Sequence, residues 1–167
     1  MKKKLIVLIS VILGGIALDQ LTKILVDKLM DLYDSITIIP GMLNITYIQN
    51  EGAAFGMLSD HRWVFMVIST VAILGMGIYL FGFCKERMLL QVGLALIISG
   101  GIGNMIDRTA YGYVIDMIDF CLFDFWMWIF NVADAFVCVG AGIVILALVL
   151  DMVKEFKEKK KENENKQ

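Results

Sequence analysis

Four aspartates lie close together around the segment GYVIDMIDF of a strongly apolar chain. Asp116 and Asp119 belong to this segment, Asp107 precedes it and Asp134 follows it. Two close carboxylates share one proton, because both cannot ionise cheaply, so that one can act as a base on water while the other acts as an acid. The same side chains could instead hold Mg²⁺ for the transfer of a lipid phosphate. Spacing alone leaves both kinds of chemistry open.

Two further polar clusters interrupt segments that otherwise read as membrane helices. The stretch DQLTK places Asp19 and Lys23 one helical turn apart, where they can form an ion pair that orients the helix. The stretch GGIGNMIDR gathers Asn104, Asp107 and Arg108 around one helix end. A charged residue at the centre of a membrane helix costs about 2.5–3.5 kcal/mol on insertion scales. Such residues are therefore expected where they pair, line a wet cavity or take part in chemistry.

Two more motifs add amides and small residues. In FNVADAF, Asn131 and Asp134 share one helix face, and Asn131 can cap the helix that follows. In NEGAAFG, Asn50 offers both a donor and an acceptor, and Gly52 allows close approach of a neighbouring backbone. A plain turn that leads back into the membrane is the simpler interpretation of NEGAAFG.

The relation between Asp116 and Asp119 depends on the local backbone. At helical spacing the two side chains would share a face, whereas in an extended strand they would point to opposite faces. Nucleophilic catalysis has little support, because no serine or cysteine can be matched with the single histidine, His61, to form a Ser-His or Cys-His arrangement. The odd number of scattered cysteines favours neither a disulfide framework nor a metal site.

The elements that carry these residues are predicted to be membrane helices. Hydrophobic residues make up 59% of the 167-residue chain, against roughly 45–50% in soluble domains, and the mean hydropathy is +0.75. A membrane helix needs about 20 apolar residues. Four stretches meet this length: Leu5–Val26, Trp63–Phe83, Met88–Ile106 and Ile129–Val153. The first could be a cleavable signal peptide, but its helical pattern continues past the expected cleavage region.

The distribution of positive charge predicts the orientation. Lysine and arginine concentrate at the N-terminus, in the CKERM turn and in the C-terminal tail, whereas the connections near residues 27–62 and 107–128 are poor in both. Positive flanks face the cytoplasm, so both termini are expected inside. We expect one membrane domain over residues 1–153 and a charged cytoplasmic tail over 154–167. No segment suggests a surface for nucleic acid.

The first outer connection has a β pattern. The runs SITII and MLNITYIQN favour strands and flank the turn residues Pro40 and Gly41. The predicted fold class is an all-α membrane protein with a small β element, in which four transmembrane helices carry a sheet on the outer face of the membrane.

Taken in order, DQLTK, NEGAAFG, GGIGNMIDR, GYVIDMIDF and FNVADAF resemble the lipoprotein signal peptidases, the type II signal peptidases of bacteria. The resemblance runs from about residue 14 to residue 140. It implies an intramembrane aspartyl protease of the bacterial cytoplasmic membrane, active near the outer leaflet, that needs no metal or other cofactor. Its substrates would be prolipoproteins carrying a diacylglyceryl-modified cysteine, cleaved just before that lipobox cysteine. Contact with membrane lipid and inhibition by globomycin-type cyclic peptides are implied as well.

The resemblance also implies roles for particular residues. The catalytic pair maps onto Asp116 and Asp134. The family commonly has an aromatic residue directly after the first catalytic aspartate, whereas Met117 follows here and an Asp-Phe pair recurs at Asp119. Asp116 follows Asp107 by nine residues, which is the interval in the family, so the resemblance favours Asp116 over Asp119 as the catalytic residue. Supporting polar positions map onto Asp19, Lys23, Asn50, Gly52, Asn104, Asp107, Arg108 and Asn131.

Two other functions remain as alternatives at this point. A magnesium-dependent membrane lipid phosphotransferase would use Asp107, Asp116, Asp119 and Asp134 as ligands, although only part of the phosphotransferase signature is present. A channel or transporter would use the carboxylates as a proton path.

Overall fold

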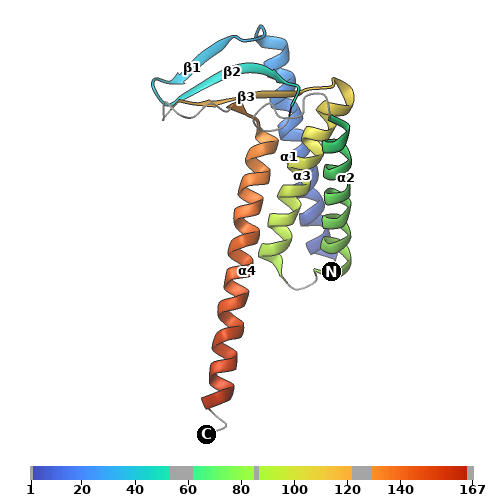
Figure 1. Cartoon of the computed structure of the whole chain (residues 1–167), viewed down its shortest axis with the longest axis vertical. Coiled ribbons are helices and arrows are strands. Elements are labelled where there is room, and N and C mark those ends of the chain that lie inside the picture. Colours follow the sequence, from blue (N-terminus) through green and yellow to red (C-terminus); the bar gives the residue numbers. More distant parts are fainter. Residues whose placement is uncertain (1, 53–61, 85–86, 122–128, 165–167) are drawn as a thin grey trace.

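Long apolar helices form a bundle, and a small antiparallel sheet lies across one end of it (Figure 1). The computed structural model describes residues 2–52, 62–84, 87–121 and 129–164. Within these ranges four helices are long and apolar enough to cross a membrane. They are α1 (Lys2–Leu29), α2 (Arg62–Ile78), which the π-helical turn η3 (Tyr79–Phe83) extends, α3 (Met88–Ala110) and α4 (Val132–Glu164). The predicted fold class is confirmed.

The helix α3 is the central member of the bundle. In its most apolar window 56% of the residues are buried inside the protein, against 6–17% for the other three helices. On those helices large apolar side chains such as Leu13, Val67 and Ile145 are more than half exposed. Apolar side chains exposed all along a helix suit contact with lipid, so that α3 is the helix on which polar groups can be shielded from lipid.

Glycines allow α3 and α4 to approach each other closely. A Cβ atom at Gly93 would lie 2.9 Å from the carbonyl oxygen of Gly140, and one at Gly140 would lie 2.6 Å from the carbonyl oxygen of Gly93. Further along, a Cβ at Gly100 would collide with the carbonyl oxygen of Ala133. Small residues at such a contact are typical of membrane helix pairs, whose association depends on close packing.

The sheet has the strand order β1-β2-β3-β4, with antiparallel neighbours throughout. Its strands are β1 (Ser35–Ile39), β2 (Leu43–Asn50), β3 (Val114–Phe120) and β4 (Ile129–Phe130). The two predicted strands around the Pro40-Gly41 turn are confirmed, and Gly41 has a φ of +69°, which glycine adopts without strain. The segment GYVIDMIDF, whose conformation the spacing left open, contains the extended strand β3.

The start of the fourth helix differs from the prediction. Ile129 and Phe130 were expected to begin the span, but they pair with Asp119 and Ile118 of β3 as a short edge strand. The helix α4 begins only after Asn131, at Val132. At its other end α4 continues to Glu164, so that its 33 residues reach about 50 Å, well beyond the roughly 30 Å of hydrocarbon in a bilayer.

Buried residues attach the sheet to the end of α1. Tyr47, Ile115 and Met117 form a small apolar cluster against Val26 and neighbouring residues. The Tyr47 hydroxyl donates a 2.6 Å hydrogen bond to Asp27 Oδ1 at the end of α1. Burial and the neighbouring Asp27 carboxylate raise the pKa of Tyr47 to about 12, so that the hydroxyl keeps its proton at physiological pH. The sheet is thereby fixed over the bundle.

Candidate active site

Asp116 lies on β3 and is almost completely buried. Its Oδ1 accepts a 2.6 Å hydrogen bond from Asn131 Nδ2, and its Oδ2 accepts a 2.9 Å bond from Asn50 Nδ2. Burial raises the pKa of Asp116 to about 7, and the charge of Asp134 adds to the rise, while the two amide donors oppose it. Asp116 can therefore hold a proton up to near-neutral pH, as an acid catalyst must.

Asp134 lies in the first turn of α4, where Asn131 caps the helix. The Asp134 N–H donates to Asn131 Oδ1 at 2.9 Å, and the Asn131 N–H donates to Asp134 Oδ2 at 3.2 Å. This reciprocal pair is a capping box. Asn104 Nδ2 donates to the other oxygen, Asp134 Oδ1, at 2.7 Å. Two N–H donors at the positive end of a helix dipole suit a carboxylate anion, the form that a general base needs.

The Asn131 side chain joins the surroundings of the two aspartates. Its Nδ2 donates to Asp116 Oδ1 and, at 3.0 Å, to Asn104 Oδ1. Asn131 itself is completely buried. A single amide next to the α4 N-terminus therefore holds a carboxylate of the sheet and one of the helix in the same hydrogen-bonded unit.

Lys23 lies beside this unit, and only 1% of its surface is exposed. Its Nζ lies 2.9 Å from Asp19 Oδ2 and 2.9 Å from Asp107 Oδ2, and it donates a 2.9 Å hydrogen bond to Asn104 Oδ1. These three contacts match the three N–H groups of an ammonium. Lys23 thus connects α1 to α3 and reaches the amide that binds Asp134.

The buried carboxylates around Lys23 also tie the elements together. Asp19 Oδ1 accepts from the Ala133 N–H of α4 at 2.9 Å, and Asp107 Oδ2 accepts from the Ile115 N–H of β3 at 3.2 Å. Gln20 Nε2 donates to Asp107 Oδ1 at 2.9 Å. A Cβ at Gly103 would collide with the Asp19 carboxylate, so glycine is needed there for α1 to approach α3.

Arg108 is half-buried in the last turn of α3. Its positive charge is attracted by Asp134, by Asp116 and by Asp107. It makes no ion pair within 4 Å with another residue in the described part of the chain. The guanidinium therefore contributes positive charge to the site, while its N–H groups form no ion pair with any of these three carboxylates.

Asp119 does not join this cluster. Asp116 and Asp119 both lie on β3, and side chains of a strand alternate between its two faces. Because the two residues are an odd number of positions apart, Asp119 points to the face opposite to that of Asp116. There it accepts hydrogen bonds from Thr46 Oγ1 at 3.0 Å and from Asn44 Nδ2 at 3.4 Å. Of the two aspartates in GYVIDMIDF, only Asp116 shares a hydrogen-bonded unit with Asp134.

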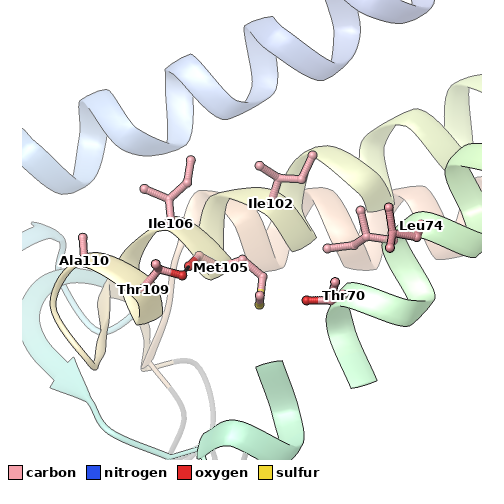
Figure 2. A pocket seen from close by; sticks show the side chains of 8 residues that line it. Thr70, Leu74, Ile102, Met105, Ile106, Thr109 and Ala110 are labelled. Carbon is pink, nitrogen blue, oxygen red and sulfur yellow. Dashed lines mark hydrogen bonds between the residues drawn. The ribbon is translucent and has the colours of Figure 1, made fainter. Parts of the chain in front are cut away.

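A separate groove opens between α2 and α3 (Figure 2). It has a volume of about 490 Å³ and is lined by side chains that include Thr70 and Leu74 of α2 and Met105 and Thr109 of α3. Both threonine hydroxyls donate to carbonyls of their own helices, at 2.7 Å each. The groove therefore presents hydrocarbon, and none of the ten predicted site residues lines it.

The predicted site residues converge in the structure. The hydrogen-bonded and charged cluster described above contains Asp19, Lys23, Asn50, Asn104, Asp107, Arg108, Asp116, Asn131 and Asp134. Gly52 joins through its N–H, which donates to Asn50 Oδ1 at 3.1 Å. The rest of the NEGAAFG motif, residues 53–56, and His61 lie outside the described residues. Sequence reasoning missed Gln20, although a polar residue next to Asp19 inside an apolar helix was a usable signal.

Comparison with known proteins gives a consistent result. The model of the family described as signal peptidase (SPase) II matches residues 11–150. The lipoprotein signal peptidase of Geobacter sulfurreducens is 40% identical over 153 residues, covering 90% of this chain and 93% of the relative. That of Streptococcus pyogenes is 45% identical over 149 residues, covering 89% and 95%. A bacterial membrane enzyme solved at 2.3 Å resolution is 33% identical and superposes with a TM-score of 0.82, covering 87% of this chain and 89% of that one.

Proposed function

The chain belongs to the signal peptidase II family, and from this membership we propose that it removes signal peptides from prolipoproteins as an intramembrane aspartyl endopeptidase. The chain is a multi-pass membrane protein and a peptidase of that family. Cleavage just before a diacylglyceryl-modified lipobox cysteine, and inhibition by globomycin-type peptides, belong to the proposal.

The observation that carries the aspartyl mechanism is the hydrogen-bonded unit around Asn131. This residue binds Asp116 Oδ1 through its side chain and Asp134 Oδ2 through its backbone N–H. The two aspartates come from different elements, a strand and a helix, and each has one oxygen held by the same residue. An arrangement of this kind keeps two carboxyl groups at a fixed relation, which a proton-sharing pair requires.

The surroundings of the two carboxyl groups support different roles for them. Asp116, buried and with a pKa of about 7, would hold the proton and donate it to the scissile carbonyl oxygen. Asp134, with its N–H donors at the start of α4, would take the proton of the attacking water. The water oxygen then bonds to the carbonyl carbon. When the C–N bond breaks, the proton held by Asp134 passes to the leaving amine, and Asp116 recovers its proton from the hydroxyl that it formed.

The remaining residues would support these two. Asn50, oriented by the Gly52 N–H, and Asn104 hold one oxygen of Asp116 and of Asp134 respectively. Arg108 would bind a polar group of the substrate, since its charge faces the site and its N–H groups are not taken up by the described carboxylates.

The shape of the molecule supports a site near the outer leaflet. The sheet and the start of α4, which carry Asp116 and Asp134, lie at one end of the bundle, and the start of α1 lies at the other, toward which α4 runs (Figure 1). Arg87 precedes α3, and the tail at the end of α4 is rich in lysine. Positive flanks favour the cytoplasm. We therefore infer that both termini are cytoplasmic and that cleavage occurs on the extracytoplasmic side.

The geometry does not favour the phosphotransferase alternative. A magnesium site would need Asp107, Asp116, Asp119 and Asp134 to converge, but Asp107 binds Lys23 and Asp119 points away from Asp116. Amide N–H donors, rather than open space, face the oxygens of Asp116 and Asp134. Donors of this kind repel a cation.

Single replacements of the aspartates by asparagine test the proposal, because asparagine keeps the shape but cannot act as a base. We expect Asp116→Asn and Asp134→Asn to abolish cleavage of a purified lipobox substrate, and Asp119→Asn to retain most of it. An active Asp116→Asn enzyme beside an inactive Asp119→Asn enzyme would refute the assignment. Cleavage that stops on addition of EDTA would refute the metal-independent mechanism.

A further inference from the structure

Three asparagine side chains hold the two proposed catalytic carboxyl groups, and each must be oriented with its NH₂ toward an aspartate. Asn50 donates to Asp116, Asn104 donates to Asp134, and Asn131 donates to Asp116. An amide group has an oxygen at one end and an NH₂ at the other, so a half turn about χ2 would turn each donor into an acceptor. Some other group must fix the orientation.

For two of these amides a backbone N–H does so. Gly52 N–H donates to Asn50 Oδ1 at 3.1 Å, and Asp134 N–H donates to Asn131 Oδ1 at 2.9 Å. Asn104 lies inside α3, where the backbone N–H groups are used by the helix itself. Its oxygen accepts instead from two side chains, Lys23 Nζ at 2.9 Å and Asn131 Nδ2 at 3.0 Å.

Lys23 is the stronger constraint of the two. An ammonium can only donate, so the Asn104 atom that faces it must be the oxygen. Asp19 and Asp107, each 2.9 Å from Nζ, hold the ammonium from two other directions. With the amide reversed, NH₂ would face an ammonium and an NH₂, and the amide oxygen would face the Asp134 carboxylate, so that all three contacts would be repulsive.

We propose that Lys23 is a positioning residue for peptide cleavage: its ammonium fixes the orientation of the Asn104 amide, which thereby presents an N–H donor to Asp134. The inference rests on the proposed role of Asp134 as the base. It gives Lys23 a function beyond the ion pair with Asp19 that the sequence predicts. Among the described residues, Asp116 of β3 and Arg108 of α3 interact electrostatically with Asp134, and Lys23 reaches Asp134 through the Asn104 amide.

The replacement Lys23→Met tests the proposal, since methionine keeps an apolar stem and cannot donate. Without the ammonium, one of the two donors to the Asn104 oxygen is lost. The amide can then turn and accept a hydrogen bond from a protonated Asp134, which disfavours the anionic form of that carboxylate. With a lipobox substrate, kcat/KM should fall more at acid pH than at neutral pH, so that the acid limb of the profile moves to higher pH, with a fall in kcat larger than the change in KM. A merely structural role would reduce the amount of folded enzyme and leave the profile in place.

A double-mutant cycle separates the amide lock from a direct effect of the lysine charge. Asn104→Ala should move the acid limb in the same direction, and adding Lys23→Met to Asn104→Ala should move it no further. The lysine charge also acts on Asp116, so a direct effect would persist without Asn104. An acid limb that still moves in the absence of Asn104 would overturn the proposal.

The replacement leaves two buried carboxylates, Asp19 and Asp107, without their cationic partner, so a charge-balanced variant completes the test. Asp19→Asn with Lys23→Met removes one charge of each sign, and we expect the same movement of the acid limb in the folded fraction isolated by gel filtration. An unmoved limb in both folded variants refutes the lock. If Asp134→Asn itself remains active, the proposed function fails instead, which distinguishes the two outcomes.

Discussion

The two aspartates of the candidate site differ in their surroundings more than in their chemistry. Asp116 is buried within the sheet and its pKa is raised to about 7, whereas Asp134 occupies the first turn of a helix, where backbone and amide N–H groups face it. Amide side chains serve as the hydrogen-bond partners of both. Amides do not titrate, so they can hold the two carboxyl groups without exchanging protons with them.

At this scale the protonation of Asp116 predicts the alkaline side of the pH profile. The pKa of Asp116 is raised, so the carboxyl keeps its proton below pH about 7 and loses it above. Activity that needs the protonated acid should therefore fall as the pH rises through about 7. The Asn50 amide stabilises the ionised form, so Asn50→Ala should move this limb to higher pH while lowering kcat.

The control for this experiment is Asn44→Ala, because Asn44 donates to Asp119 on the opposite face of the sheet. The profile of this variant should coincide with that of the unaltered enzyme. An alkaline limb that stays in place in Asn50→Ala, or moves to lower pH, would contradict the assignment of the limb to Asp116.

The sequence singled out the residues that converge in the candidate site, but it did not predict their contacts. Polar residues in apolar helices are costly, and this pointed to Asp19, Lys23 and Asn104. The choice between Asp116 and Asp119 depends on the backbone of β3, which spacing does not determine. The contact from Lys23 to Asn104 depends on the distance between α1 and α3, which Gly103 makes possible and which no local pattern encodes.

At the scale of elements, the site depends on how closely α3 and α4 pack. Gly93 and Gly140 meet backbone to backbone, and the same contact surface continues to Gly100 and Ala133, next to the residues that cap α4. A wider spacing between the helices would move Asn131 and Asp134 away from Asn104.

We therefore expect Gly140→Ala to lower the thermal stability of the detergent-solubilised protein and its cleavage rate. Its Cβ would lie 2.6 Å from the Gly93 carbonyl oxygen, and overpacking of this kind costs about 1–3 kcal/mol. The matched control is Gly142→Ala on the same helix, where a Cβ meets no atom within 4 Å and alanine favours the helix. Equal melting temperatures for the two variants would show that the helices do not pack as described.

The sequence predicted helices and strands correctly where the residue types of a segment and the turn residues that flank it indicated the same element. The runs around Pro40-Gly41 read as strands and form β1 and β2. Ile129 and Phe130 were misplaced because two apolar residues before a helix look the same in a strand and in a span. The capping residue Asn131 marked the true start, since its side chain can satisfy an N–H of the first turn only from outside the helix.

At the scale of the whole molecule, the buried polar residues of the candidate site and the apolar core occupy different parts of the bundle. The sheet and the buried charges occupy one end, whereas the apolar core includes Leu80 of η3, which follows α2, and Leu90 in the first turn of α3. Beyond this core α4 continues alone, as Figure 1 shows. There it carries exposed pairs such as Lys154–Glu158 and Lys160–Glu164, which lie one turn apart within the helix itself.

The projecting part of α4 should therefore be dispensable for cleavage. Pairs between exposed side chains of one helix contribute only about 0.3–0.5 kcal/mol each, and those in the tail do not connect it to the bundle. We expect a chain that ends at Val153 to insert into membranes and cleave a lipobox substrate within about twofold of the full chain. This end point keeps Asp151, whose Oδ2 lies 3.2 Å from Arg87 Nη1 at the start of α3.

The control is a chain that ends at Gly140, which loses about half of the span and should be inactive. A Val153 chain that is folded in the membrane but does not cleave would show that residues 154–167 belong to the peptidase unit.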